Sequence, residues 1–269
     1  MNIVDRGSGT PVILVPGIQG RWEWMRPTVD ALAKRCRVIT FSLADEPTCE
    51  GHFDETSGFA CYVQQVADAL DAVGLERATV CGISYGGLIA AAFAARHPDR
   101  VSALVLMSAL PPSWGPDSRA RFLMRAPRLL TPLFCVLSLR MCREIVAARG
   151  GLISGLAFSV THALNALRHV FSPTLMARRV TLVDGLDLER EIRQIQCPTL
   201  VATGDADLDR VVPVHQTREY LRLLPDATSA TIPRTGHLGP ITRAEMFADL
   251  VVDYAGHTVH EGDRRRRVG

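Results

Sequence analysis

The alternation of two hydrophobic periods along the chain constrains the fold more than any other feature of the sequence. Short apolar runs rich in β-branched residues lie at residues 12–16, 37–41, 78–82 and 101–107. Longer stretches with helical spacing separate them, at about residues 24–35, 58–73 and 86–96. Runs such as VILVP and VSALVLM are apolar at almost every position, which suits strands that helices cover on both sides. The pattern predicts an α/β fold with a mostly parallel sheet flanked by helices.

The alternation stops at Pro111 and Pro112 and resumes only near Pro198. The intervening residues are rich in Leu, Met, Phe and Arg with helical spacing, and prolines and glycines break them into short segments. Beyond them, strands are predicted at 198–203 and 228–232, and helices at 214–224 and 243–255. We therefore predict an α/β core formed by residues 1–111 and 191–257, a helical cap inserted at 112–190, and a flexible charged tail at 258–269.

Length, charge and cysteine content argue against several broad classes. A chain of 269 residues can bury a large core without disulfides or a structural metal. The formal net charge of +2 does not indicate a nucleic-acid partner, and the seven cysteines include no C-x-x-C pair. No apolar run reaches the roughly 18 residues of a membrane-spanning helix, and the N-terminal segment does not resemble a secretory signal. We expect a soluble, cytoplasmic protein with a small-molecule substrate and no nucleic acid, integral membrane segment, metal or cofactor.

A serine flanked by glycines follows the predicted strand at 78–82. Residues 82–86 have the sequence GISYG, which fits G-x-S-x-G, and an alanine-rich helix follows directly. A serine on such a strand-to-helix turn is forced into a strained conformation that exposes its hydroxyl, and small neighbours permit the tight turn. Glycine-flanked serines also begin ordinary helices, so the simple alternative makes Ser84 an N-cap. The position between a buried strand and a helix favours a nucleophile.

With this turn the chain resembles the α/β-hydrolase superfamily, from about Ile3 to Ala255. The resemblance implies a serine hydrolase whose nucleophile, acid and histidine follow in that chain order, with Ser84 as the nucleophile. The segment TGDAD at residues 203–207 is similar to the family's G-x-x-D, so the resemblance assigns the acid to Asp207. Asp205 and Asp209 remain alternatives.

The same resemblance implies the base and the oxyanion donors. His237 lies between a predicted strand and the last predicted helix, where the family presents its catalytic histidine. The backbone N–H groups of Tyr85 and Ile18 are the implied donors to the developing oxyanion. The chain departs from the family at Pro16-Gly17, where many relatives have His-Gly, and after residue 41, where it lacks the usual Asp and glycine-rich turn. The substrate preference of a particular subfamily is therefore not transferred.

These residues predict a carboxylic ester hydrolase that acts through an acyl-serine on a small to medium, moderately apolar ester or lactone. A serine nucleophile excludes the relatives that attack with an aspartate, namely haloalkane dehalogenases and epoxide hydrolases. The alternatives are a C–C bond hydrolase or a cofactor-free perhydrolase with the same triad. An alternative of another class is a non-catalytic binding protein with this fold, which the complete set of catalytic positions disfavours.

The predicted cap contains apolar side chains that could line a substrate pocket, although most are expected to pack within the cap. These residues are Leu123, Met124, Leu129, Leu130, Phe134, Leu137, Met141, Phe158 and Phe171. Arg121, Arg125 and Arg128 could meet an anionic substrate group, and the favoured interpretation is that they face solvent.

Overall fold

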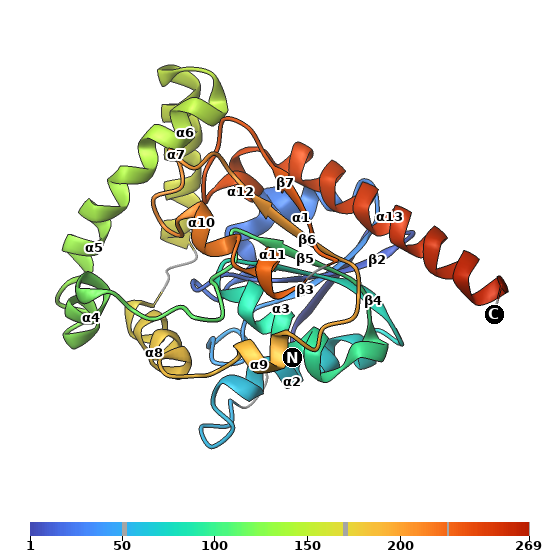
Figure 1. Cartoon of the computed structure of the whole chain (residues 1–269). Coiled ribbons are helices and arrows are strands. Elements are labelled where there is room, and N and C mark those ends of the chain that lie inside the picture. The colour runs from blue at the N-terminus through green and yellow to red at the C-terminus, as the bar shows by residue number, and fades with distance from the viewer. Residues whose placement is uncertain (50–52, 169–171, 225, 269) are drawn as a thin grey trace.

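The protein is built around one twisted sheet (Figure 1). The computed structural model describes residues 1–49, 53–168, 172–224 and 226–268, with the backbone alone at 162–168 and 257–268. Within this part of the chain the strand order is β1-β3-β2-β4-β5-β6-β7, and every neighbouring pair is parallel except β1 with β3. The strands are β1 (Ile3–Arg6), β2 (Pro11–Val15), β3 (Arg37–Phe41), β4 (Ala78–Ile83), β5 (Val101–Met107), β6 (Thr199–Thr203) and β7 (Thr228–Thr231). The predicted α/β architecture is confirmed.

Helices cover both faces of the sheet because successive strand residues point to opposite sides. On β2, Ile13 and Val15 belong to a core cluster shared with α2 (Phe59–Ala72) and α3 (Tyr85–Arg96). Val12 and Leu14 belong to a second cluster, shared with α1 (Arg26–Leu32) and α13 (Ala244–Val268). Shorter helices complete these layers: η1 (Trp22–Met25), η2 (Pro98–Arg100), α9 (Glu189–Ile192), α10 (Val214–Thr217), α11 (Tyr220–Leu223) and α12 (Gly239–Thr242).

The structure differs from the sequence prediction at three elements. The edge strand β1 was not predicted, because its short, half-exposed sequence IVDR becomes a strand only through antiparallel pairing with β3. The predicted helix at 214–224 is two short helices, α10 and α11. Helix α13 continues to Val268, where we predicted a helix end at 255 and a flexible tail, and its Glu- and Arg-containing sequence favours helix locally.

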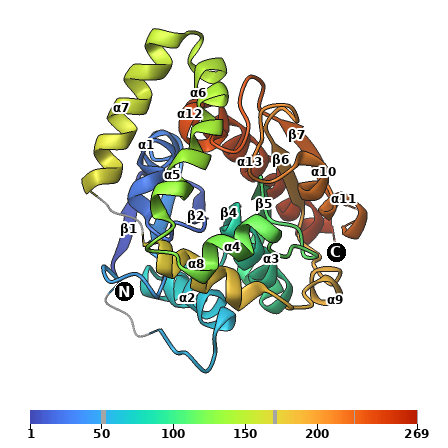
Figure 2. The same ribbon diagram turned by 90° about the vertical axis from the view of Figure 1, so that its left-hand side faces the viewer.

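Between β5 and α9 the chain forms a series of helices, and this segment is called the cap below. They are α4 (Ser118–Arg125), α5 (Thr131–Ser138), η3 (Leu139–Met141), α6 (Cys142–Arg149), α7 (Leu152–Arg168) and α8 (Pro173–Val183). Asp117 caps α4 by accepting a hydrogen bond from the N–H of Ala120, and Ser172 caps α8 in the same way. Figure 2 shows α4, α5 and α8 in front of the sheet, and α6 and α7 as a hairpin beside it. No helix within the described residues is long and apolar enough to cross a membrane.

Candidate active site

Ser84 occupies a strained turn between β4 and α3. Its backbone has φ +55° and ψ −118°, a conformation that non-glycine residues rarely adopt. The residue is buried at 5% exposure, and its side chain forms no cap hydrogen bond to α3. The alternative in which Ser84 is only an N-cap therefore does not account for its geometry, and its hydroxyl remains available for chemistry.

Glycines make this turn possible because backbone passes where side chains would otherwise stand. A Cβ at Gly82 would lie 2.3 Å from the carbonyl oxygen of Gly86, and a Cβ at Gly86 would lie 2.4 Å from that of Pro16. A Cβ at Gly87 would lie 2.3 Å from the Cβ of Ala109. These contacts are too close for any side chain, so the chain needs glycine at all three positions to hold Ser84 at the end of β4.

The carboxylate beside His237 is that of Asp209. The distance from His237 Nδ1 to Asp209 Oδ2 is 3.4 Å, longer than an ideal hydrogen bond, as is common before a substrate binds. The other oxygen of Asp209 accepts hydrogen bonds from the N–H groups of Val211 and Val212, at 3.0 and 2.9 Å. Burial of Asp209 opposes ionisation, but His237 and the two N–H donors outweigh it and lower the pKa of this carboxyl.

The structure places Asp209, which the sequence analysis keeps as an alternative to Asp207, beside His237. Asp207 is exposed, whereas the side chain of Asp209 is almost fully buried. Asp205 is already engaged, because its carboxylate accepts a hydrogen bond of 2.7 Å from the N–H of Arg234. The sequence alone does not single out Asp209, because Asp205 and Asp207 also have backbone N–H groups two and three residues ahead. Only the structure shows that the N–H groups of Val211 and Val212 hold the carboxylate of Asp209.

Two glycines join the loop of Asp209 to the loop of His237. A Cβ at Gly204 would lie 2.4 Å from the carbonyl oxygen of Thr235, and a Cβ at Gly236 would lie 2.5 Å from the N atom of Asp209. The N–H of Asp205 also donates to the carbonyl of Thr235 at 2.7 Å. Asp209 and His237 therefore lie on two loops in direct backbone contact.

The sheet register brings the predicted site residues to one edge. Val15 pairs with Gly82, and Thr203 pairs with Thr231, so the carboxyl ends of these parallel strands lie level. Ile18, Ser84, Asp209 and His237 all lie in the segments that leave these ends. In open α/β sheets this edge is where ligands bind.

Two backbone N–H groups beside Ser84 remain available to an oxyanion. Tyr85 begins α3, so its N–H has no partner within the helix. Within the described residues neither this group nor the N–H of Ile18 donates a hydrogen bond. A Cβ at Gly17 would lie 3.7 Å from the Cβ of Ser84, so the loop of Ile18 packs directly on the turn. The arrangement has the parts of an oxyanion hole.

Comparison with known proteins is decisive for the family. The sequence model of the alpha/beta hydrolase family matches residues 12–250. The chain belongs to the alpha/beta hydrolase family. It is 28% identical to 2-hydroxy-6-oxo-2,4-heptadienoate hydrolase of Pseudomonas putida, over 94% of this chain and 91% of that one. It is 26% identical to a protein of Caulobacter sp. provisionally named a carbamate hydrolase, over 90% and 89%.

Solved structures show the same fold. An enol-lactonase from Burkholderia xenovorans superposes with a TM-score of 0.73 at 22% identity, covering 94% of this chain and 95% of that one. An esterase from Exiguobacterium antarcticum superposes with a TM-score of 0.77 at 18% identity, covering 94% of each. These structures show the fold, whereas the family model and the curated relatives show that the chain is a hydrolase of this family.

Two charged cap residues that the sequence analysis missed also reach the core of this hydrolase. Glu144 on α6 is 1% exposed and Arg179 on α8 is 0% exposed. Glutamate and arginine side chains usually lie on the surface of a protein. The residue types of Glu144 and Arg179 therefore gave no reason to expect that they are buried. Only the fold reveals which residues they contact.

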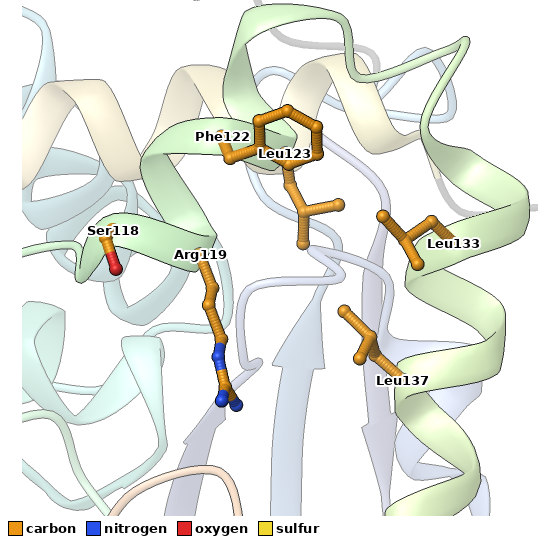
Figure 3. Close-up of a pocket in the computed structure, with 6 residues that line it drawn as sticks. All are labelled: Ser118, Arg119, Phe122, Leu123, Leu133 and Leu137. Atoms are coloured by element: carbon orange, nitrogen blue, oxygen red, sulfur yellow. The ribbon is translucent and has the colours of Figure 1, made fainter.

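The cap of the hydrolase contains a pocket of about 300 Å³ between α4 and α5 (Figure 3). It is lined by Ser118, Arg119, Phe122, Leu123, Leu133 and Leu137. Leu123 and Leu137 were among the predicted lining residues, whereas Phe171 lies outside the described residues. Neither Ser84 nor His237 lines this pocket, so it belongs to the cap. Among the described side chains, no group of three His, Cys, Asp or Glu could hold a metal ion.

Proposed function

We propose that this hydrolase cleaves carboxylic esters or lactones through an acyl-enzyme formed on Ser84, with His237 as base and Asp209 as the residue that orients it. The observation that carries the proposal is the strained backbone of Ser84, at φ +55°, whose side chain forms no cap hydrogen bond to α3. Strain of this kind persists where the surrounding structure enforces it, and it clusters at active sites. In the alpha/beta hydrolase family the same strand-to-helix turn presents the nucleophile.

The first half of the reaction follows from these positions. Asp209 faces Nδ1 of His237 and holds a proton there, which leaves Nε2 to accept the hydroxyl proton of Ser84. The Ser84 oxygen attacks the ester carbonyl, and the carbonyl oxygen becomes negative. The N–H groups of Ile18 and Tyr85 stabilise that charge. Collapse of the tetrahedral intermediate breaks the bond to the alkoxy oxygen, which takes the proton from His237 and leaves as the alcohol.

The second half repeats the sequence with water. His237 takes a proton from a water molecule, whose oxygen attacks the acyl carbon on Ser84. The bond to the serine oxygen then breaks, Ser84 regains its proton from His237, and the carboxylic acid leaves. The balance of the reaction requires one water molecule and no redox partner.

Carbon–carbon bond hydrolysis is the second candidate, and a specific observation favours it. The relative at 28% identity is named for hydrolysis of 2-hydroxy-6-oxo-2,4-heptadienoate, a compound whose name contains no ester or amide. The same serine, histidine and oxyanion donors can serve that reaction, so the two candidates differ in substrate and not in machinery.

The deciding experiment compares p-nitrophenyl esters of increasing acyl length with a 2-hydroxy-6-oxo-2,4-dienoate, using the wild type and Ser84→Ala. We expect ester turnover by the wild type and loss of at least about 10³-fold in kcat in Ser84→Ala, because the nucleophile is absent. Exclusive turnover of the dienoate would replace the ester proposal with the second candidate. Failure to turn over any substrate, together with no labelling of Ser84 by a fluorophosphonate, would contradict both.

A further inference from the structure

Glu144 on the cap helix α6 accepts hydrogen bonds from the loop that carries His237. Its Oε1 accepts hydrogen bonds from the N–H of Gly236 at 2.8 Å, the N–H of Leu238 at 2.5 Å and the hydroxyl of Thr235 at 3.0 Å. These donors lie immediately before and after His237, so one carboxylate oxygen fixes both of its flanks. Thr235 is also fully buried and shares a hydrogen bond of 2.9 Å with the hydroxyl of Thr242.

Arg179 on the cap helix α8 donates a hydrogen bond to the loop that carries Ile18. Its Nη1 donates to the carbonyl oxygen of Ile18 at 2.8 Å, while Nη2 donates to Asp45 and Glu46 at 2.6 Å each. The guanidinium lies where a side chain at Gly20 would stand, since a Cβ there would be 2.3 Å from Nη1. Asp45 and Glu46 are themselves buried, so they hold the guanidinium beneath Ile18.

We propose that Glu144 and Arg179 are positioning residues, through which the cap sets the placement of the base and of one oxyanion donor. The inference rests on the proposed function. Neither side chain has to touch substrate: Glu144 acts through the backbone around His237, and Arg179 acts through the carbonyl of Ile18. Holding that carbonyl restricts rotation of Ile18, whose N–H must point at the developing oxyanion. Through these two contacts the cap contributes to the geometry of the site.

The expected loss of rate follows from how little displacement of its groups an active site tolerates. A misplacement of about 1 Å by a change outside the reacting groups can cost about 10²-fold in rate. Loss of Glu144 leaves the buried N–H of Gly236 and the part-buried N–H of Leu238 without an acceptor, so the loop of His237 must move to find new partners. Because both residues act on transition-state geometry, the loss falls on kcat and leaves KM nearly unchanged.

The first test compares Glu144→Ala and Glu144→Gln with the wild type on the best p-nitrophenyl ester. We expect kcat to fall about 100-fold in the alanine variant and about 3- to 10-fold in the glutamine variant, whose amide oxygen still accepts from the loop, with KM within about two-fold in both. The matched control is Arg143→Ala, an exposed neighbour on α6, which we expect to behave as the wild type. If Glu144→Ala does not fold, Glu144→Gln decides alone.

The second test examines Arg179→Lys, since a single ammonium cannot reach Asp45, Glu46 and Ile18 together. We expect kcat to fall about 10- to 100-fold, and the inhibition constant of a trifluoromethyl ketone, which forms a tetrahedral adduct with serine, to rise by a similar factor. The matched control is Arg178→Ala, which removes an ion pair with Glu55 outside the site. Should Arg179→Lys not fold, Glu46→Gln replaces it, with an expected fall of about 3- to 10-fold.

The outcomes separate this inference from the proposed function. An active wild type with unchanged kcat in the folded Glu144 and Arg179 variants would overturn the positioning roles while leaving the ester hydrolase intact. Variants that alter only KM or only thermal stability would likewise overturn them, because a purely structural contact has those effects. An inactive wild type that a fluorophosphonate does not label contradicts the proposed function first, and the positioning roles fall with it.

Discussion

At the scale of single residues, the site depends on groups that the backbone holds in place. Ser84 keeps its unusual φ because glycines around it allow the chain to close. Asp209 faces His237 because one of its oxygens is occupied by the N–H groups of Val211 and Val212, which leaves the other to the imidazole. Local hydrogen bonds, and positions at which only glycine fits, therefore determine where the side chains of Ser84 and Asp209 lie.

The acid can be identified by a pair of matched substitutions. Asp209→Asn should lower kcat by about 10³- to 10⁴-fold, because an amide favours the wrong histidine tautomer. Asp207→Asn, two residues away and exposed, should leave kcat within about two-fold of the wild type. Both are measured as steady-state hydrolysis of the same ester. A large loss in the Asp207 variant with little change in the Asp209 variant would return the acid to Asp207.

The sequence singles out Ser84 as the candidate nucleophile, but it does not single out one aspartate as the candidate acid. Ser84 lies in the pattern G-x-S-x-G between a predicted strand and a predicted helix, and the glycines on either side permit the tight turn. Three aspartates lie within residues 205–209, and their choice depends on which carboxylate a turn directs toward His237. The contacts of Glu144 and Arg179 were beyond prediction because they join segments about ninety to over one hundred and thirty residues apart.

At the scale of elements, the strands and helices of the core follow their hydrophobic period closely. β3 and β5 have the bounds predicted for them and β2 is shifted by one residue, because buried parallel strands are continuous apolar runs. Elements with little apolar content, such as β1, are stabilised by pairing and leave no such signature. Close approach of elements also sets limits on side chains, as at the junction of β2 with α3.

That junction gives a stability prediction. Gly86→Ala should destabilise the fold by about 1–3 kcal/mol, because its Cβ would lie 2.4 Å from the carbonyl oxygens of Val15 and Pro16. In an exposed helix the same change stabilises by roughly 1 kcal/mol. A loss of stability in Gly86→Ala would therefore show that close packing at this position outweighs the helix propensity of alanine. Gly151→Ala is the control, since its Cβ would meet nothing within 4 Å. Thermal unfolding of both variants measures the difference, and equal Tm values would contradict the packing argument.

At the scale of the whole molecule, the cap and core share buried charges. Burial raises the pKa of Glu144, even though the N–H groups of Gly236 and Leu238, the hydroxyl of Thr235 and the charge of His237 act to lower it. The folded protein therefore holds a proton on Glu144 more tightly than the unfolded chain does. The resulting stabilisation is complete below the unfolded pKa of about 4.3 and is lost as pH rises through the folded value.

Glu144→Gln removes this titration and so makes it measurable. We expect the free energy of unfolding of the wild type, minus that of the variant, to fall as pH rises from about 4 to about 8. Urea unfolding at several pH values across that range gives the difference directly. A difference that stays constant with pH, or one that grows, would show that the buried carboxyl does not titrate as its surroundings require.

The contacts of Glu144 and Arg179 also bear on how such an enzyme can diversify. An insertion that only covered a site could be exchanged between relatives by recombination, and each new version would bring a new specificity. Here the insertion supplies the acceptor for the N–H groups of Gly236 and Leu238 and the donor to the carbonyl of Ile18. A transplanted cap must therefore carry an equivalent acid and an equivalent cation. Without them, we expect the loops of His237 and Ile18 in the chimera to be displaced.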